Sequence, residues 1–340
     1  MVGYSLGSKD AENEIEVLGE AESNSVTFSK SLFIDLNITS ESILCQHKLV
    51  VPYSIINTAK KAREKNVREV IFNANREAAD ESNVRMTLNL WGFESFIEYI
   101  FTVSELVFLE GLIPILNIAE LNLREMNHIS SIIALLAIPL KIDSEAGIPL
   151  SESQSKMIEW AGRLNLPLIL HFPIDALKPT IIKQTFKKLV AFQEQYRHIH
   201  ECIIYQKNPF DQSLKTPIKG NINQLFQTIK NIQAIVEDKI TITVPIHHYP
   251  PYITQLLELG IKDFPHIPQE LPSSITGDNT FSLELLSKKA ALMEYQLLNR
   301  FPLSFKFIQA GKYSSKLGQV FDSYQYKIKK FNQEKTKGKR

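Results

Sequence analysis

Residues 167–206, PLILHFPIDALKPTIIKQTFKKLVAFQEQYRHIHECIIYQ, contain one complete strand–helix–strand unit. The two ends of this stretch, 167–173 and 199–206, are short and almost continuously apolar, which is typical of parallel strands covered on both faces. Between them, residues 178–196 place apolar side chains at helical spacing. Two apolar strands joined by a helix form a βαβ unit, so this stretch predicts a parallel sheet.

The same alternation continues in both directions along the chain. Eight strands are predicted, at 31–38, 67–74, 113–118, 132–142, 167–173, 199–206, 239–246 and 261–267. Eight helices follow them, at 52–65, 92–110, 123–128, 151–164, 178–196, 221–238, 250–259 and 282–300. Ser151 and Gln154 form a candidate capping box, and Gly260 stands where a helix should end in the left-handed conformation. Eight such units predict an α/β protein with a (β/α)8 barrel of the TIM type. An open doubly wound sheet is the alternative, but no Gly-x-Gly-x-x-Gly follows the first strand.

Composition and charge restrict the class of protein. Of the 340 residues, 44% are hydrophobic, which is enough for a large core and excludes a disordered or fibrous chain. The 38 basic residues oppose 37 acidic ones, so no overall field draws the chain to a nucleic acid or an anionic membrane. The longest apolar run, 129–140, is shorter than the roughly 20 residues that span a bilayer. These features predict a soluble, cytoplasmic protein with no membrane or nucleic-acid partner.

Both ends of the chain differ from its middle. Residues 1–24 are acidic and polar and predict a disordered arm, because such a segment cannot bury enough apolar surface. Residues 311–340 end in a run of basic side chains, which predicts a solvated tail. The barrel is therefore expected to occupy residues 25–310.

Polar side chains are predicted at the carboxyl ends of the strands, where (β/α)8 barrels carry their chemistry. The candidates at this rim are Asn117, His171, Asp175, His247, His248, Asp263 and His266. Histidine and carboxylate ligands from separate strands can hold a metal ion that activates water, so a metal-dependent hydrolase or lyase is one hypothesis. The alternative is a solvated barrel mouth with polar side chains and no metal. His198 and His200 share a strand but stand at its start, the end that serves stability.

Three separated motifs are similar to those of one family. They are Glu159-Trp160-Ala161-Gly162-Arg163-Leu164, residues 196–204 (Tyr-Arg-His-Ile-His-Glu-Cys-Ile-Ile), and Leu259-Gly260-Ile261-Lys262-Asp263. Together they resemble the CofG family of radical S-adenosylmethionine (SAM) enzymes, the 7,8-didemethyl-8-hydroxy-5-deazariboflavin synthases. The similarity keeps its order over roughly 25–307 and implies a radical-SAM-type barrel.

The resemblance also implies a [4Fe–4S] cluster, which the family holds with a Cys-x-x-x-Cys-x-x-Cys loop after the first strand. Such clusters require soft thiolate ligands. In this chain Ser40, Leu44 and His47 stand at the three positions, and Cys45 falls one residue away from the second. We therefore expect no three-thiolate cluster from this loop.

Other positions that contact SAM in the family are changed as well. The family's Gly-Glu after the second strand falls on Asn75 and Arg76, and its glutamate after the fourth strand falls near Lys141. Each change puts a cation where the family has a carboxylate. The family's glycine-rich stretch at the fifth strand falls on 171–179, where bulkier residues take the space a cofactor needs.

Three hypotheses follow, none of which assigns a catalytic residue. The first is a pseudoenzyme related to deazaflavin synthase, without cofactor, that binds an active radical SAM subunit or a small molecule. The second is a synthase or synthase subunit in deazaflavin biosynthesis that holds [4Fe–4S] and SAM through non-standard ligation. The third is the metal-dependent enzyme that uses the rim histidines. Cys202 lies inside a predicted strand and is interpreted as a small core residue.

Overall fold

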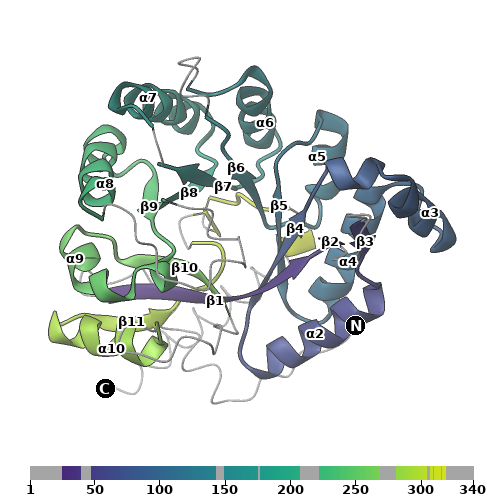
Figure 1. Ribbon diagram of the computed structural model, residues 1–340, viewed down its shortest axis with the longest axis horizontal. Helices are drawn as coiled ribbons and strands as arrows, with labels where there is room; N and C mark the ends of the chain where they lie inside the picture. The colour runs from purple at the N-terminus through teal and green to yellow at the C-terminus, as the bar shows by residue number, and fades with distance from the viewer. Residues whose placement is uncertain are drawn as a thin grey trace, which may run out of the picture.

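The computed structural model describes residues 25–39, 47–142, 149–174, 177–206, 222–268, 281–304, 307–308, 310–314 and 316–318 (Figure 1). Within these ranges, no helix combines the length and the apolar character needed to cross a membrane.

Eight parallel strands of the described chain form an almost closed barrel, in the order β10-β1-β4-β5-β6-β7-β8-β9. Their bounds are β1 (Ser25–Asp35), β4 (Glu69–Ala74), β5 (Ile113–Ile118), β6 (Leu135–Pro139), β7 (Leu168–Pro173), β8 (Ile199–Tyr205), β9 (Thr241–Thr243) and β10 (Asp263–Pro268). A further strand, β11 (Gln296–Asn299), pairs in parallel with the first residues of β1. The predicted α/β barrel of the TIM type is confirmed, with one boundary, between β9 and β10, that no described ladder closes.

Helices surround the strands on the outside (Figure 1). Those that follow the barrel strands are α2 (Pro52–Glu64), α4 (Phe96–Leu109), α5 (Leu123–Ile129), α6 (Glu152–Arg163), α7 (Pro179–Tyr196), α8 (Ile222–Val236), α9 (Ile253–Glu258) and α10 (Leu283–Leu292). A short hairpin of β2 (Asn37–Thr39) and β3 (His47–Leu49), three 3-10 turns at 77–80, 246–248 and 250–252, and α3 (Ser82–Leu90) complete the described elements. The sequence pattern did not predict α3, a helix that buries only Val84 and Leu88.

The last predicted helix, 282–300, is wrong in its second half. Glu294 adopts a left-handed backbone conformation (φ 61°), and the chain then extends as β11. Leu297 and Leu298 pair with Val26 and Thr27 of β1. A short apolar segment fits a strand as well as a helix, and only the distant partner strand decides between them.

Local capping agrees with part of the sequence prediction. The Oγ of Ser151 accepts a hydrogen bond from the backbone N–H of Gln154 (3.2 Å), as in a capping box. The Gln154 side chain, however, turns to the backbone around Pro139 and Lys141 and does not return to Ser151. Gly260 ends its helix in the left-handed conformation (φ 80°), as predicted. The complete capping box of the described helices begins α5, between Asn122 and Glu125.

The interior of the barrel is packed with apolar side chains. Ile71, Ile115, Leu135, Ile169 and Ile203 form one buried cluster there. The same cluster contains side chains from the end of the described chain, namely Phe301, Leu303, Phe307, Ile308 and Leu317. The C-terminal segment therefore contributes directly to the core of the barrel.

Polar contacts place this C-terminal segment at the amino ends of the strands. Lys312 Nζ donates to Asn165 Oδ1 (2.7 Å), just before β7, and Ser314 Oγ donates to Ser131 O (2.8 Å), before β6. The described residues between 310 and 318, part of the predicted tail, thus pack against the barrel. The opposite, carboxyl end of the strands remains the rim at which functional side chains are expected.

Gly162, in one of the motifs that resemble the CofG family, has a packing role. A Cβ atom at this position would lie 2.5 Å from Cγ of Tyr196, a residue of the second shared motif. We expect Gly162→Ala to lower the free energy of unfolding by about 1–3 kcal/mol, because α6 and α7 must separate to admit the methyl group. Urea unfolding followed by circular dichroism measures this loss. Lys156→Ala, on the exposed face of α6, is the matched control and should change stability by less than about 0.5 kcal/mol. Equal stability of the two variants would contradict the assigned packing role.

Candidate functional site in the barrel

A chain of hydrogen bonds joins three polar side chains at the carboxyl ends of neighbouring strands. Asn117 Nδ2 donates to Asn73 Oδ1 (2.8 Å), and Asn73 Nδ2 donates to Asp35 Oδ1 (2.8 Å). The register pairs Asp35 of β1 with Asn73 of β4, and Asn73 with Asn117 of β5. Asn117, a predicted rim residue, also carries a buried Oδ1 with no hydrogen-bond partner in the described structure. An unsatisfied buried acceptor is costly, so this edge of the rim favours a bound donor group or water.

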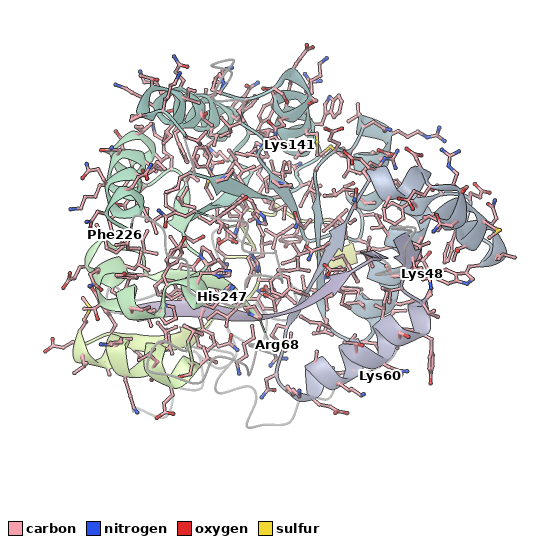
Figure 2. All side chains as sticks on the ribbon, in the orientation of Figure 1. Lys48, Lys60, Arg68, Lys141, Phe226 and His247 are labelled. Carbon is pink, nitrogen blue, oxygen red and sulfur yellow. The ribbon has the colours of Figure 1, made fainter. Side chains whose placement is uncertain are left out.

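The residues at the family's SAM-contact positions have three different surroundings in the structure. Arg76, just after β4, forms an ion pair with Glu125 of α5 (Nη2–Oε1, 2.7 Å). Asn75 Oδ1 accepts the backbone N–H of Glu77 (3.0 Å) and so shapes the turn after β4. Lys141 is exposed beyond the end of β6, beside α6 (Figure 2).

His171 is buried inside the barrel on β7. Its neighbours Leu170 and Phe172 belong to the core between strands and helices, so alternation along the strand turns His171 toward the barrel interior. Burial lowers the pKa of His171 to about 3, and His266 acts in the same direction. The imidazole is therefore neutral near pH 7.

His247 and His248 contact each other in the 3-10 turn that follows β9, with their ring planes tilted by 43°. Their ring centroids are 4.2 Å apart. Burial, followed by the neighbouring His248, lowers the pKa of His247 well below its ordinary value. Figure 2 shows His247 near β10. The described part of the chain contains no group of three histidine, cysteine or carboxylate side chains arranged to hold a metal ion.

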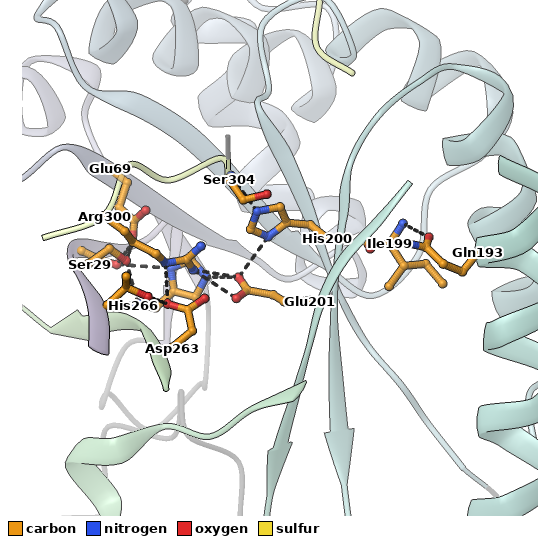
Figure 3. Close-up of polar contacts among 12 residues, drawn as sticks. Ser29, Glu69, Gln193, Ile199, His200, Glu201, Asp263, His266, Arg300 and Ser304 are labelled. Carbon is orange, nitrogen blue, oxygen red and sulfur yellow. Dashed lines mark hydrogen bonds and ion pairs between the residues drawn. The ribbon is translucent and has the colours of Figure 1, made fainter. Parts of the chain in front are cut away.

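Asp263 and His266 lie inside the barrel, which corrects their predicted position at the rim. Asp263 is the first residue of β10, and His266 lies within the same strand. His266 Nδ1 is 2.8 Å from Glu69 Oε1, and His266 Nε2 is 3.1 Å from Glu201 Oε1 (Figure 3). Glu69 also accepts hydrogen bonds from the hydroxyls of Ser29 (2.9 Å) and Ser31.

Arg300, directly after β11, extends this network. Its Nη2 donates to Glu201 Oε2 (3.0 Å), and its Nε is 3.0 Å from Asp263 Oδ1 (Figure 3). Thr27 Oγ1 donates to the same oxygen of Asp263 (2.8 Å). We call Glu69, Glu201, Asp263, His266 and Arg300 the ion network. It joins β4, β8, β10 and the segment after β11.

Four members of the ion network keep their charges although they are buried. Asp263 differs, because burial raises the pKa of its carboxyl group. Burial raises the pKa of Glu69 and Glu201, but His266 beside Glu69 and Arg300 beside Glu201 outweigh burial, so both pKa values lie below the ordinary range. Burial lowers the pKa of His266, but Glu69 and Glu201 outweigh it and raise the pKa to about 9. His266 is therefore an imidazolium at pH 7 and donates to both carboxylates.

His198 lies just before β8 and His200 is its second residue, so both stand at the amino end of the strand, as predicted. His198 Nε2 contacts the backbone oxygen of Ile158 (2.8 Å), and burial lowers its pKa to about 4. His200 Nε2 accepts the backbone N–H of Ser304 (2.9 Å) and so fastens the C-terminal segment. Cys202 is fully buried, and burial raises the pKa of its thiol. The prediction of a core cysteine is confirmed.

Sequence reasoning missed Glu69, Glu201 and Arg300. The available signal was a carboxylate inside each of two apolar strands, because a charge placed in a core requires an opposite charge. Ser40, Leu44, Cys45 and Asp175 lie outside the described residues, and the side chain of His47 is not described.

Comparisons with known proteins show which fold this chain shares. No family model matches the chain. Among solved structures, the FeFe-hydrogenase maturase HydG from Carboxydothermus hydrogenoformans superposes with a TM-score of 0.57 over 94% of this chain and 80% of that one, at 11% identity. The chain therefore shares the fold of this structure, a (β/α)8 barrel.

Sequence relatives narrow the class further. The 7,8-didemethyl-8-hydroxy-5-deazariboflavin synthase of Archaeoglobus fulgidus is 21% identical over 88% of this chain and 96% of its own length. That of Methanococcoides burtonii is 20% identical over 88% and 95%. The synthase of Methanothermobacter thermautotrophicus is 26% identical, but the match spans only 53% of this chain and 61% of the relative. The chain is a distant relative of these deazaflavin synthases.

Proposed function

We propose that this chain is a radical-SAM-like barrel without cluster-based catalysis, a pseudoenzyme that acts as a binding or accessory protein related to deazaflavin synthesis. The observation that carries the proposal is its set of cysteines. A [4Fe–4S] cluster of the usual kind needs three thiolates, and the chain has two cysteines in all. Leu44, at one ligand position of the family, has no donor atom.

The location of Cys202 supports the proposal. Cys202 lies in β8 among the side chains packed between strands and helices, with no exposed surface. Burial raises the pKa of its thiol, which disfavours the thiolate form that ligates iron. At most Cys45 is left as a ligand, so the residues of this chain do not fit the cluster.

The charges at the family's SAM-contact positions also support a chain that does not bind SAM. In the family, the position of Arg76 carries a carboxylate that meets the amino group of SAM. A guanidinium repels an ammonium group, and Arg76 is already paired with Glu125 (2.7 Å). Lys141 adds a second cation at a position where the family has glutamate.

Binding is the activity that the remaining rim supports. The Asp35–Asn73–Asn117 chain of hydrogen bonds presents fixed polar groups at the carboxyl ends of three strands, where barrels bind ligands. We propose an active radical SAM subunit or a small molecule as the partner. A metal-dependent hydrolase receives no support from the described histidines, since no metal-binding group forms among them.

Iron and sulfide content after anaerobic reconstitution tests the proposal. We expect neither iron nor acid-labile sulfide, and no heat of SAM binding in calorimetry on the same sample. The archaeal deazaflavin synthase from Archaeoglobus fulgidus, treated in parallel, is the positive control. About four irons per chain together with SAM binding would overturn the proposal and support a synthase with non-standard ligation.

A gain-of-ligand variant sharpens this test. The triple substitution Ser40→Cys, Leu44→Cys and His47→Cys restores the spacing of the family's loop. We expect this variant to take up iron without binding SAM, because Arg76 and Lys141 still oppose the cofactor.

Reconstituting the wild-type chain with an active deazaflavin synthase subunit then distinguishes an accessory protein, which co-purifies, from a small-molecule binder, which does not.

A further inference from the structure

In the described barrel, β9 and β10 are neighbouring strands that no hydrogen-bonded ladder joins. We call this boundary the seam. Hydrogen-bonded ladders join every other pair of neighbours in the described barrel. β9 is only three residues long, and Pro245 follows it closely. On the far side of β10, the pairing with β1 shifts in register between Phe28 and Lys30. Backbone hydrogen bonding is therefore weakest where the barrel closes.

Side chains of the ion network cross this seam. Glu201 belongs to β8, on one side of the seam, and His266 belongs to β10, on the other; their side chains meet at 3.1 Å. The second nitrogen of His266 is 2.8 Å from Glu69 on β4, two strands beyond β10. The imidazolium thus joins the two sides, and only its doubly protonated form can donate to both carboxylates.

The backbone of His266 has an unusual conformation, and neighbouring hydrogen bonds hold it. His266 adopts a left-handed conformation (φ 59°), which is unfavourable for a residue other than glycine. Its backbone N–H donates to Ser29 Oγ (3.0 Å), and that hydroxyl in turn donates to Glu69 (2.9 Å). Such strain persists only where surrounding contacts hold it in place.

We propose that protonated His266 holds the β9–β10 seam closed, and that loss of its proton opens the seam while the rest of the barrel stays folded. This is a pH-sensitive conformational switch, and it does not depend on the function proposed above.

The charges around His266 set the pH at which the switch acts. Glu69 and Glu201 favour the proton, whereas Arg300, which contacts the same Glu201 oxygen (3.3 Å), and His171, on β7, are basic groups that disfavour it. His200 and Asp263 also face Glu201. The folded pKa of about 9 lies above the ordinary value of 6.5. The stabilisation is therefore complete below pH 6.5 and is lost as the pH rises through about 9.

Thiol labelling at two positions tests the switch. Thr243, on β9 beside the seam, is fully buried, as is Cys202 on β8. In a Cys45→Ser background, labelling of Thr243→Cys measures opening of the seam. Labelling of Cys202 measures separation of the sheet from the helices that cover it. Labelling rates are divided by that of a free thiol peptide at the same pH. We expect the ratio of the two rates to rise by up to about tenfold per pH unit between pH 6.5 and about 9, and to level off above that, where His266 is neutral in both states.

Two variants complete the test. In a His266→Gln background, the thiol at position 243 should already react much faster than Cys202 at pH 7, with no further dependence on pH. His198→Gln is the matched control, because His198 is buried and neutral over this range, and it should leave the ratio unchanged. Equal labelling of both positions at every pH would overturn the proposal, and so would an unchanged ratio in His266→Gln. If His266→Gln does not fold, the pH profile in the histidine-containing background decides alone.

Discussion

Replacing Arg300 with methionine is expected to lower the free energy of unfolding by about 3–5 kcal/mol. Methionine keeps most of the apolar volume, but the carboxylate of Glu201 and the carboxyl group of Asp263 lose the guanidinium that contacts both. The Arg300 side chain is only 7% exposed, so water cannot replace it. Urea unfolding at pH 7 measures the loss.

The matched control for Arg300→Met is Arg163→Met. Arg163 forms an exposed ion pair with Glu159 on α6, and exposed pairs contribute only about 0–1 kcal/mol. If both variants lost the same small amount, the ion network would not contribute to stability as argued. The difference between wild type and Arg300→Met should also shrink on acidification, since the low folded pKa of Glu201 makes its contribution present above pH 4.5 and lost below it.

Ending the chain after Arg300 is expected to abolish folding. Five buried side chains, Phe301, Leu303, Phe307, Ile308 and Leu317, would be removed from the barrel core. Burial of each is worth about 1.5–3 kcal/mol. Together they match the whole net stability of a typical domain, about 5–15 kcal/mol. Circular dichroism and size-exclusion chromatography of the truncated chain measure the effect.

A shorter truncation separates the packed segment from the basic run at the end of the chain. Ending the chain after Tyr326 removes residues 327–340, which are mostly basic and polar. We expect this truncation to change stability by less than about 0.5 kcal/mol. Loss of folding in the shorter truncation, or a stable fold in the longer one, would contradict the role of 301–318 in the core.

Periodicity predicted the barrel because each apolar strand is followed by a helix with its own apolar face. β5, predicted at 113–118, is found at those residues, and α7 differs from its prediction by one residue. The failures are long-range effects. Residues 296–299 become a strand only because the start of β1 lies beside them, and that contact joins residues far apart in the sequence. Local pattern carries no information on such a partner.

The candidate site was predicted less completely than the fold. Asn117 and His171 were predicted at the rim from their places near the carboxyl ends of predicted strands, and they lie in β5 and β7. His266 was predicted at the rim because it stands near the end of the predicted strand 261–267. Its true partners, Glu69 and Glu201, are separated from it by 197 and 65 residues. Only the closed barrel brings these three together.

The pairing of β1 has a consequence for synthesis on the ribosome. Thr27 of the first strand contacts Asp263, 236 residues later, and its neighbours pair with β11 further still. At about 5–20 residues per second, the ribosome takes roughly 12–47 s to make that stretch. Throughout that time the nascent β1 has one exposed edge, and nascent β4 is its earliest available partner in the sheet. Exposed strand edges attract other chains, so the emerging protein is expected to depend on chaperone protection until its last elements leave the exit tunnel.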